Sequence, residues 1–297
     1  MGHKIKSTTL YKYDLVLKNA NAQELDWKKH KFSYTEFDEN QNIVCEIKYN
    51  EDGEVDEKNI NKFDKKGNLI EELSYLTEDE IAEHKTYERD EKGNVVKIFK
   101  HYQDGEKDTI NFIRDQAGKI LEKITIDSYN EEEAREIIEY AGEKVISRKE
   151  YEYDELVVEE SYKYNEKGVL IELTRWTHED EDSKYKNIYD DEGNIYKALK
   201  YNLKDKLISK AEYFYKDGKL AEIAEESPYG KNITRFNYDE AGNVVLQTEE
   251  NGAGKLNNKA IRKFNEHNDV SETEVFIDFH GKGINQHYVL KYEYEYL

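Results

Sequence analysis

The sequence predicts an all-β protein built from repeated antiparallel hairpins. Three observations lead to this fold class: tyrosines at alternate positions, a turn motif in which Asp or Asn is followed three residues later by Gly, and the regular spacing of that motif. We expect a meander of about 24 strands, made of two-strand repeats of about 25 residues and coiled into a twisted superhelix or an open shell.

The tyrosines indicate strands. Many of the 25 tyrosines are two residues apart, as in the C-terminal sequence Lys291-Tyr-Glu-Tyr-Glu-Tyr296. A period of two places these rings on one face of a strand. Tyrosine suits a half-buried sheet surface because its ring packs while its hydroxyl stays in water.

The turn motif indicates tight hairpins. Asp or Asn favours the first position of a type I turn, and Gly favours the fourth, where φ is positive in a three-residue hairpin with a bulge. An aromatic residue often precedes the acid, and aliphatic residues follow the Gly. The motif occurs at Asn50–Gly53, Asp64–Gly67, Asp90–Gly93, Asp115–Gly118, Asn165–Gly168, Asp190–Gly193 and Asp239–Gly242.

The spacing of these turns defines the repeat. The main series of turns is centred on positions 41, 67, 93, 118, 142, 168, 193, 218, 242 and 268, which are 24 to 26 residues apart. A second series of polar turns lies midway between them, so that a turn comes every 12 or 13 residues. Gln41 and Asn268 replace Gly, which makes the first and last repeats degenerate.

Three segments also have helical features. Thr77–Ala82 contains a possible capping box, 130–141 is rich in Glu, Ala and Ile, and 22–30 is ambiguous. All three fit the register of the hairpin array, and we therefore expect strands and turns there.

We expect one continuous array over residues 1–297. Residues 1–33 would form a degenerate N-terminal capping unit, 34–284 the repeats, and 285–297 a C-terminal edge strand. A β-propeller is less favoured because a four-stranded blade needs about 40–50 residues, and a sandwich would need more continuous apolar faces. Free edges at both ends would allow self-association.

The turn motif resembles the YD repeat of rearrangement-hotspot (Rhs) proteins. The resemblance rests on Phe63-Asp64-Lys-Lys-Gly67-Asn68-Leu69, on Tyr189-Asp190-Asp-Glu-Gly193-Asn194-Ile195 and on the stretch 234–248, and it covers most of residues 34–284. It implies long strips of β-hairpins that wind into a hollow shell, often around a toxin. Asn or Lys stands where the family usually has Arg after the Gly, and the period is longer than expected.

Composition excludes several function classes. With 45 Lys and Arg against 66 Asp and Glu, the net charge is −21, which disfavours binding to nucleic-acid backbones. A single cysteine permits neither an intrachain disulfide nor a cysteine-based metal cluster, and no apolar run is long enough for a membrane span. The N-terminal residues lack a signal-peptide pattern, from which we expect a cytoplasmic protein unless a dedicated system exports it.

No catalytic or metal-binding motif emerges, and we expect no enzyme activity and no cofactor. The acidic stretches 50–57, 131–133 and 179–182 are interpreted as solvated turns rather than calcium sites. His280 and His287 flank a turn and could face each other, but a zinc site would need further ligands. Cys45 lies in an alternating strand with no activating base in sequence, which predicts a packed thiol.

The tryptophans are the candidate contact residues. Most tyrosines are expected to pack across strands. Trp176 precedes an acidic turn and is the best candidate for an exposed contact, and Trp27 is the second, unless it closes the N-terminal end of the array.

Three functions fit the sequence. The first is a non-enzymatic acidic scaffold that binds another protein, preferably a basic one, through its extended sheet surface. The second, from the Rhs resemblance, is an immunity or cargo-holding component of a toxin system. The third is a glycan-binding module or glycan hydrolase that stacks sugars on tyrosine. A neighbouring toxin gene would favour the second, and turnover on glycans the third.

Overall fold

The fold is all-β, as the sequence predicts. The structure is a computed structural model that describes residues 3–17, 25–178, 183–280 and 285–297. In these residues 22 strands of 7 to 13 residues alternate with short turns, and no helix occurs. The expected number of about 24 strands is too high because β1 (Ile5–Leu17) and β2 (Leu25–Phe37), with 13 residues each, are longer than the repeat predicts.

The chain forms two compact units. Unit 1 comprises Met1–Thr86 and Thr234–Leu297, and unit 2 comprises Tyr87–Ile233. The division falls within β6 (Ile81–Arg89) and β18 (Gly230–Tyr238).

Unit 1 is an antiparallel sheet in the order β19–β20–β21–β22–β1–β2–β3–β4–β5–β6. Its other strands are β3 (Ile43–Tyr49), β4 (Val55–Phe63), β5 (Leu69–Tyr75), β19 (Val244–Asn251), β20 (Leu256–Phe264), β21 (Val270–Ile277) and β22 (Gln286–Tyr296).

Unit 2 is an antiparallel sheet in which β7 to β17 pair in sequence order. Its strands are β7 (Val95–His101), β8 (Lys107–Arg114), β9 (Ile120–Ile126), β10 (Glu132–Ala141), β11 (Lys144–Glu152), β12 (Glu155–Tyr164), β13 (Leu170–Thr177), β14 (Ser183–Tyr189), β15 (Ile195–Tyr201), β16 (Leu207–Lys216) and β17 (Lys219–Ser227).

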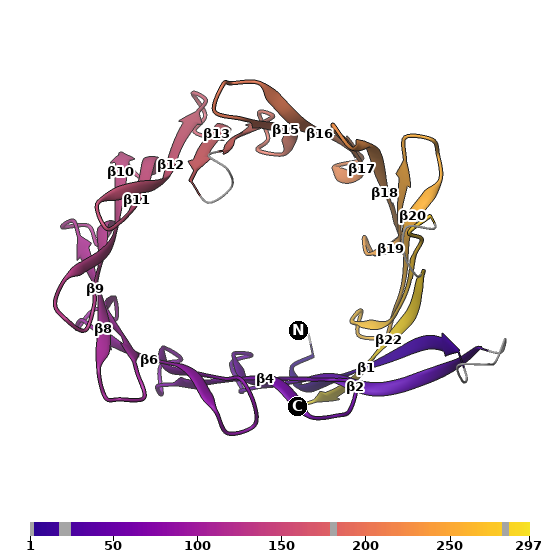
Figure 1. Cartoon of the computed structure of the whole chain (residues 1–297), viewed down its shortest axis with the longest axis horizontal. Helices are drawn as coiled ribbons and strands as arrows, with labels where there is room; N and C mark the ends of the chain where they lie inside the picture. The colour runs from indigo at the N-terminus through magenta and orange to yellow at the C-terminus, as the bar shows by residue number, and fades with distance from the viewer. Residues whose placement is uncertain (1–2, 18–24, 179–182, 281–284) are drawn as a thin grey trace. The chain divides into compact units, whose positions relative to one another are not determined.

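The terminal strands pair with each other, and Figure 1 shows β1 between β2 and β22. The expected superhelix or open shell with a C-terminal edge strand is therefore wrong: β22 pairs with both β21 and β1, β1 pairs with both β22 and β2, and neither strand offers a free edge for self-association. The alternation of Lys, Glu and Tyr in β22 serves this pairing. Lys6 Nζ lies 2.7 Å from Glu295 Oε1, and the Lys12 ammonium lies 4.8 Å from the centre of the Tyr288 ring.

The described residues of the three segments with helical features form strands and turns, as expected: they lie in β2, in β6 and the turn before it, and in β10 and the turn before it. The hydroxyl of Thr77 accepts a 3.3 Å hydrogen bond from the Glu80 amide, as in a capping box, but this contact lies in the turn before β6.

Every position of the main series has the predicted positive φ. All ten positions predicted from the spacing, 41, 67, 93, 118, 142, 168, 193, 218, 242 and 268, have positive φ, between 62° and 94°. Gln41 (67°) and Asn268 (69°) adopt it without Gly. Register shifts beside these turns, for example between Lys62 and Phe63, show the bulge that a three-residue hairpin requires.

In five turns of the main series, an aspartate carboxylate accepts hydrogen bonds from the Asn four residues later and so holds the turn in its conformation. Asp239 Oδ1 accepts the amide of Asn243 at 2.8 Å, and Asp239 Oδ2 accepts the Asn243 side chain at 3.0 Å. The same Asp–Asn clamp recurs at Asp38, Asp64, Asp90 and Asp190. These hydrogen bonds, the side-chain bond from Asn first, hold the pKa of each of the five aspartates below its usual value.

In several strands, a side chain at or next to the last residue donates a hydrogen bond to a backbone carbonyl near the start of the preceding strand. The hydroxyls of Tyr140, Tyr164 and Tyr215 donate to the carbonyls of Ile120, Val145 and Ile195 at 2.8 to 2.9 Å. Arg114 Nη2 donates to the Val95 carbonyl in the same way. Bulges leave backbone groups unpaired, and these side chains satisfy them. A tyrosine or arginine at the end of a strand therefore has a hydrogen-bonding role beyond packing.

Each unit is a single layer. Within each unit, all contacts between described elements are between hydrogen-bonded neighbouring strands, and Val158 is the one buried hydrophobic residue that the described residues include. Turns and cross-strand pairs therefore carry the stability that a two-layer domain obtains from its core.

The turn backbone gives a test at Gly242, whose φ is 94°. We expect Gly242→Val to destabilise the protein by about 1–3 kcal/mol, because a β-branched residue resists positive φ. Gly242→Asn is the matched control and should cost less, since Asn268 holds the equivalent position with positive φ. Urea unfolding measures both. Equal stability of the Val variant and the native protein would contradict the assigned turn.

Candidate binding site on the sheet of unit 2

The candidate site is a row of polar side chains on one face of the sheet of unit 2. Direct cross-strand pairing links Arg148, Glu160 and Arg175, and continues through Tyr185 and Lys200 to Ser209. Residues opposite each other in antiparallel strands share a face. This polar row, defined by these six residues, crosses β11 to β16.

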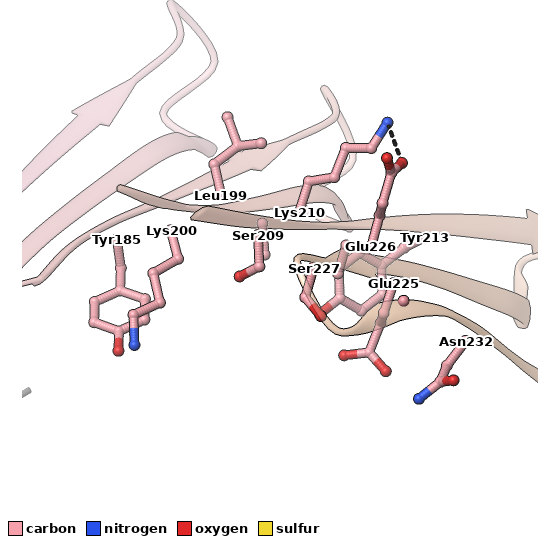
Figure 2. A pocket seen from close by; sticks show the side chains of 13 residues that line it. Tyr185, Leu199, Lys200, Ser209, Lys210, Tyr213, Glu225, Glu226, Ser227 and Asn232 are labelled. Atoms are coloured by element: carbon pink, nitrogen blue, oxygen red, sulfur yellow. Dashed lines mark ion pairs between the residues drawn. The ribbon is translucent and has the colours of Figure 1, made fainter. Parts of the chain in front are cut away.

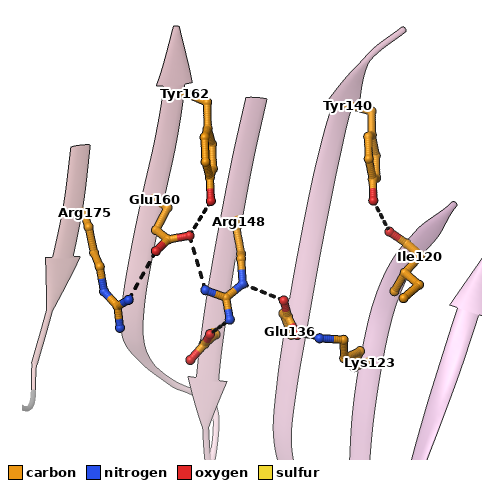
Figure 3. A network of polar contacts seen from close by, with 9 residues as sticks. Ile120, Lys123, Glu136, Tyr140, Arg148, Glu160, Tyr162 and Arg175 are labelled. Carbon is orange, nitrogen blue, oxygen red and sulfur yellow. Dashed lines mark hydrogen bonds and ion pairs between the residues drawn. The ribbon is translucent and has the colours of Figure 1, made fainter. Parts of the chain in front are cut away.

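The first part of the polar row is a charge network around Glu160, which is only 6% exposed (Figure 3). Glu160 Oε2 accepts hydrogen bonds from Arg148 Nη1 at 3.2 Å and from the Tyr162 hydroxyl at 2.5 Å. Arg175 Nη1 lies 3.4 Å from Glu160 Oε1. A buried carboxylate is expensive unless it is paired, and these three partners meet that requirement.

Arg148 connects Glu160 to a second carboxylate, that of the half-buried Glu136. Its Nε donates to Glu136 Oε1 at 2.6 Å, its Nη2 contacts Glu150, and Lys123 Nζ lies 2.5 Å from Glu136 Oε2. The network thus contains three basic and three acidic side chains, and its charges balance. Such pairing fixes the guanidinium and both carboxylates in position.

Two opposing effects set the pKa values in this network. Burial lowers the pKa of Arg148, but its hydrogen bond and charge contacts with Glu136, Glu150 and Glu160 outweigh burial and raise it. Burial raises the pKa of Glu136, but hydrogen bonds from Lys123 and Arg148 bring it below its usual value. Burial, then the hydrogen bond to Glu160, raises the pKa of Tyr162.

The second part of the polar row borders a hollow of about 370 Å³ (Figure 2). Small side chains on β15 and β16, Ala198, Ser209 and Ala211, form its floor. On one side the Lys200 ammonium lies 5.2 Å from the centre of the Tyr185 ring. Tyr213 and Glu225 line the other side, where burial and the Glu225 charge raise the pKa of the Tyr213 hydroxyl.

The hollow suits recognition better than catalysis. Its two carboxylates, Glu225 and Glu226, are neighbours in β17 and point to opposite faces of the sheet, where Glu226 pairs with Lys210 at 3.1 Å (Figure 2). They cannot flank one bond in the way that glycosidase carboxylates do. A floor of small side chains between two tyrosines instead offers space for one inserted side chain.

The two tryptophans lie in different units. Trp176 is half-buried in β13, with its ring 6.5 Å from that of His178. It points away from the polar row, because it follows Arg175 in the strand. Trp27 in unit 1 is 43% exposed, and its ring packs edge-on against His287 at 5.2 Å. Neither residue lines the hollow.

The remaining candidates form no shared site in the described residues. His287 contacts Glu274 at 2.8 Å and His280 contacts Asn257 at 2.8 Å, so the two histidines do not face each other. No group of three or more described His, Cys, Asp or Glu side chains is arranged to hold a metal ion. Burial raises the pKa of Cys45, which is the opposite of activation. The acidic stretch 179–182 lies outside the described residues.

Sequence reasoning did not find the polar row. Its successive charged members are separated by 12 to 25 residues and look like ordinary alternating strand residues. The turn positions could have found the pair of Arg148 and Glu160, because both residues lie six positions from residue 154 in the turn between their strands.

Comparisons with known proteins identify no family. No family model matches the chain, and no curated protein matches it. Among solved structures, it is similar to a TcdB2-TccC3-Cdc42 complex (10% identity, TM-score 0.31, covering 91% of this chain) and to a porin-like protein from Bacteroides uniformis (8% identity, TM-score 0.29, covering 99% of both chains). The chain spans 19% of the TcdB2-TccC3-Cdc42 chain. Similarity at this level assigns no function.

The described residues contain no helix that could cross a membrane.

The depressed pKa of Glu136 predicts acid sensitivity. Its stabilising effect is complete above the unfolded pKa of about 4.3 and is lost as the pH falls through the lower folded pKa. We expect Glu136→Gln to lower the free energy of unfolding at pH 7 by about 1–3 kcal/mol and to lose less stability on acidification from pH 6 to pH 2. Urea unfolding at several pH values measures this.

Glu91→Gln, in an exposed turn, is the matched control and should leave the pH dependence nearly unchanged. An identical acid response of the Glu136→Gln variant and the native protein would contradict the assigned network.

Proposed function

We propose that the chain is a non-enzymatic, acidic β-hairpin repeat scaffold that binds another protein through its sheet. The observation that carries this proposal is the single layer: within each unit, no described element packs on a sheet face. Sheets of ordinary domains cover at least one face with a second layer. A partner protein would supply that cover.

The polar row and the hollow support protein binding on unit 2. The network around Glu160 holds its side chains in fixed positions, which lowers the entropy cost of recognition. The hollow beside it has the size and lining of a pocket for one anchoring side chain.

The charge supports a basic partner. Many lysines on the sheet already pair with glutamates on neighbouring strands, as Lys186 does with Glu172 at 2.7 Å and Lys197 with Glu212 at 3.1 Å. Because 66 acidic residues face 45 Lys and Arg, this pairing cannot neutralise the chain. An excess of negative charge speeds encounter with a basic protein at low salt.

We also include in the proposal that the repeats are of the YD type. The three sequence stretches that resemble YD repeats support this, and so does the recurrence of a tyrosine-to-bulge hydrogen bond beside the turns. Immunity or cargo holding in a toxin system would be a special case of the scaffold function.

An affinity experiment tests the proposal. The purified protein is used as bait in a lysate of source cells, washed at low and high salt, and its partner is identified by mass spectrometry. We expect one stoichiometric protein that high salt releases. Ser209→Trp, which fills the hollow, should reduce retention at least about tenfold, which corresponds to about 1.4 kcal/mol.

Leu199→Trp is the matched control, because Leu199 lies in the neighbouring strand on the opposite face (Figure 2). It should retain the partner. If the native protein retains no partner, the scaffold proposal is wrong. If both variants retain the partner equally, the hollow is not part of the binding surface.

A further inference from the structure

Tyrosines stand at the tips of three consecutive hairpins of unit 2. Tyr102, Tyr129 and Tyr153 lie in or beside the turns that join β7 to β8, β9 to β10, and β11 to β12. Because the strands are antiparallel and pair in sequence order, these turns lie along one end of the sheet. We call these three residues, with the acidic turn residues beside them, the tyrosine rim.

The rim tyrosines are unusually exposed. Tyr129 is 84% exposed and Tyr153 is 72% exposed, while Tyr102 is 47% exposed and bonds through its hydroxyl to Asp108. Further turns at the same end continue the pattern with Leu203 (65%) and Tyr229 (100%). Large apolar surfaces at successive turns are typical of interaction sites rather than of solvated tips.

Tyr153 is strained as well as exposed. It forms a two-residue turn with Asp154, and φ is 47° and 66° at the two residues. Turns of this kind favour Asn-Gly, because a bulky side chain disfavours positive φ. An exposed ring recovers little packing energy in return, and so folding alone does not explain a tyrosine here.

The rim is also strongly acidic. Residues 102–107, 127–135 and 152–155 contain nine carboxylates against two basic side chains, Lys107 and Arg135. Arg135 is already paired with Glu132 at 2.7 Å. Rings surrounded by carboxylates suit a partner that presents both apolar and cationic side chains.

The opposite end of the same strands provides an internal comparison. The turns 90–94, 115–119, 141–144 and 165–169 contain five acidic and four basic residues. In these described turns no large hydrophobic side chain is exposed. The tyrosines and the charge excess are therefore specific to one end of unit 2.

The spacing of the rim indicates the shape of its partner. Successive turns at one end are two strands apart, which is about 10 Å. An α-helix advances about 10.5 Å in seven residues and returns to nearly the same side. A helix lying across the turns would meet one tyrosine in each heptad.

We propose that the tyrosine rim binds a basic amphipathic helix of another protein, with apolar side chains against Tyr102, Tyr129 and Tyr153 and lysines or arginines against the neighbouring carboxylates. This assignment rests on the proposed scaffold function and names the surface and partner chemistry for it.

A synthetic peptide tests the rim. The probe is a fluorescent helical peptide of about 21 residues, made of Lys, Ala and Leu with the leucines on one face. A scrambled peptide of equal composition is the reference. Fluorescence anisotropy with the full-length protein should show tighter binding of the helical peptide, and weaker binding at about 0.5 M salt than at about 0.05 M.

The test variant is Tyr129→Ser combined with Tyr153→Asn, and the matched control is Ile113→Ser combined with Phe214→Ser. The control residues are also exposed, at 43% and 49%, but lie in strands. We expect the rim variant to weaken peptide binding at least about tenfold and the control to change it less than twofold.

Thermal unfolding distinguishes a loss of peptide binding from a loss of folding stability in the rim variants. Tyr153→Asn alone should unfold at the same or a higher temperature than the native protein, since Asn tolerates positive φ, while its peptide affinity falls. Unchanged peptide affinity of the rim variant, or equal binding of the scrambled peptide, would overturn the assignment. Neither result would affect the capture of a partner from lysate. A failure of that capture would instead contradict the scaffold proposal.

Discussion

The absence of a second layer in either unit is the constraint on which the rest of the structure depends. A strand here has stabilising neighbours only on its two sides, so register has to be set locally. The Asp–Asn clamp and the positive-φ position do this at one end of each well-formed hairpin, as at Asp239, Asn243 and Gly242. The tyrosine and arginine bonds to the bulge carbonyls then connect each hairpin to the one before it.

The same constraint explains why the buried positions are mostly polar. With Val158 the one buried hydrophobic residue in the described chain, burial occurs mostly where charged and hydroxyl groups satisfy each other. Glu160, between Arg148 and Arg175, is one example. Hydrogen-bonded charge pairs give position and specificity more readily than net stability. A surface organised in this way is suited to recognition, and the pairing of β1 with β22 removes the edges through which such a sheet would otherwise associate with itself.

Local features were predictable from the sequence, whereas long-range ones were not. The ten turn positions, the strands in place of helices and the two-residue alternation of Tyr292, Tyr294 and Tyr296 follow from short-range stereochemistry, and the three rings do stack. The pairing of β1 with β22 depends on residues almost 290 positions apart, and the Lys, Glu and Tyr alternation fits a free edge equally well. The polar row escaped notice because its members become neighbours only through strand pairing. Trp176 and Trp27 were predicted as contacts from their residue type and, for Trp176, from the acidic turn that follows it, and they line neither the hollow nor the tyrosine rim.

The heat-capacity change of unfolding tests the single-layer account most directly, because it reports the apolar surface that folding removes from water. A globular protein of 297 residues would give roughly 3.6–4.5 kcal/mol/K. The account predicts a value clearly below this range, at most about two thirds of it, from calorimetry at several pH values. A value within the range would show that folding buries a core that a single-layer sheet cannot provide, and would contradict the account.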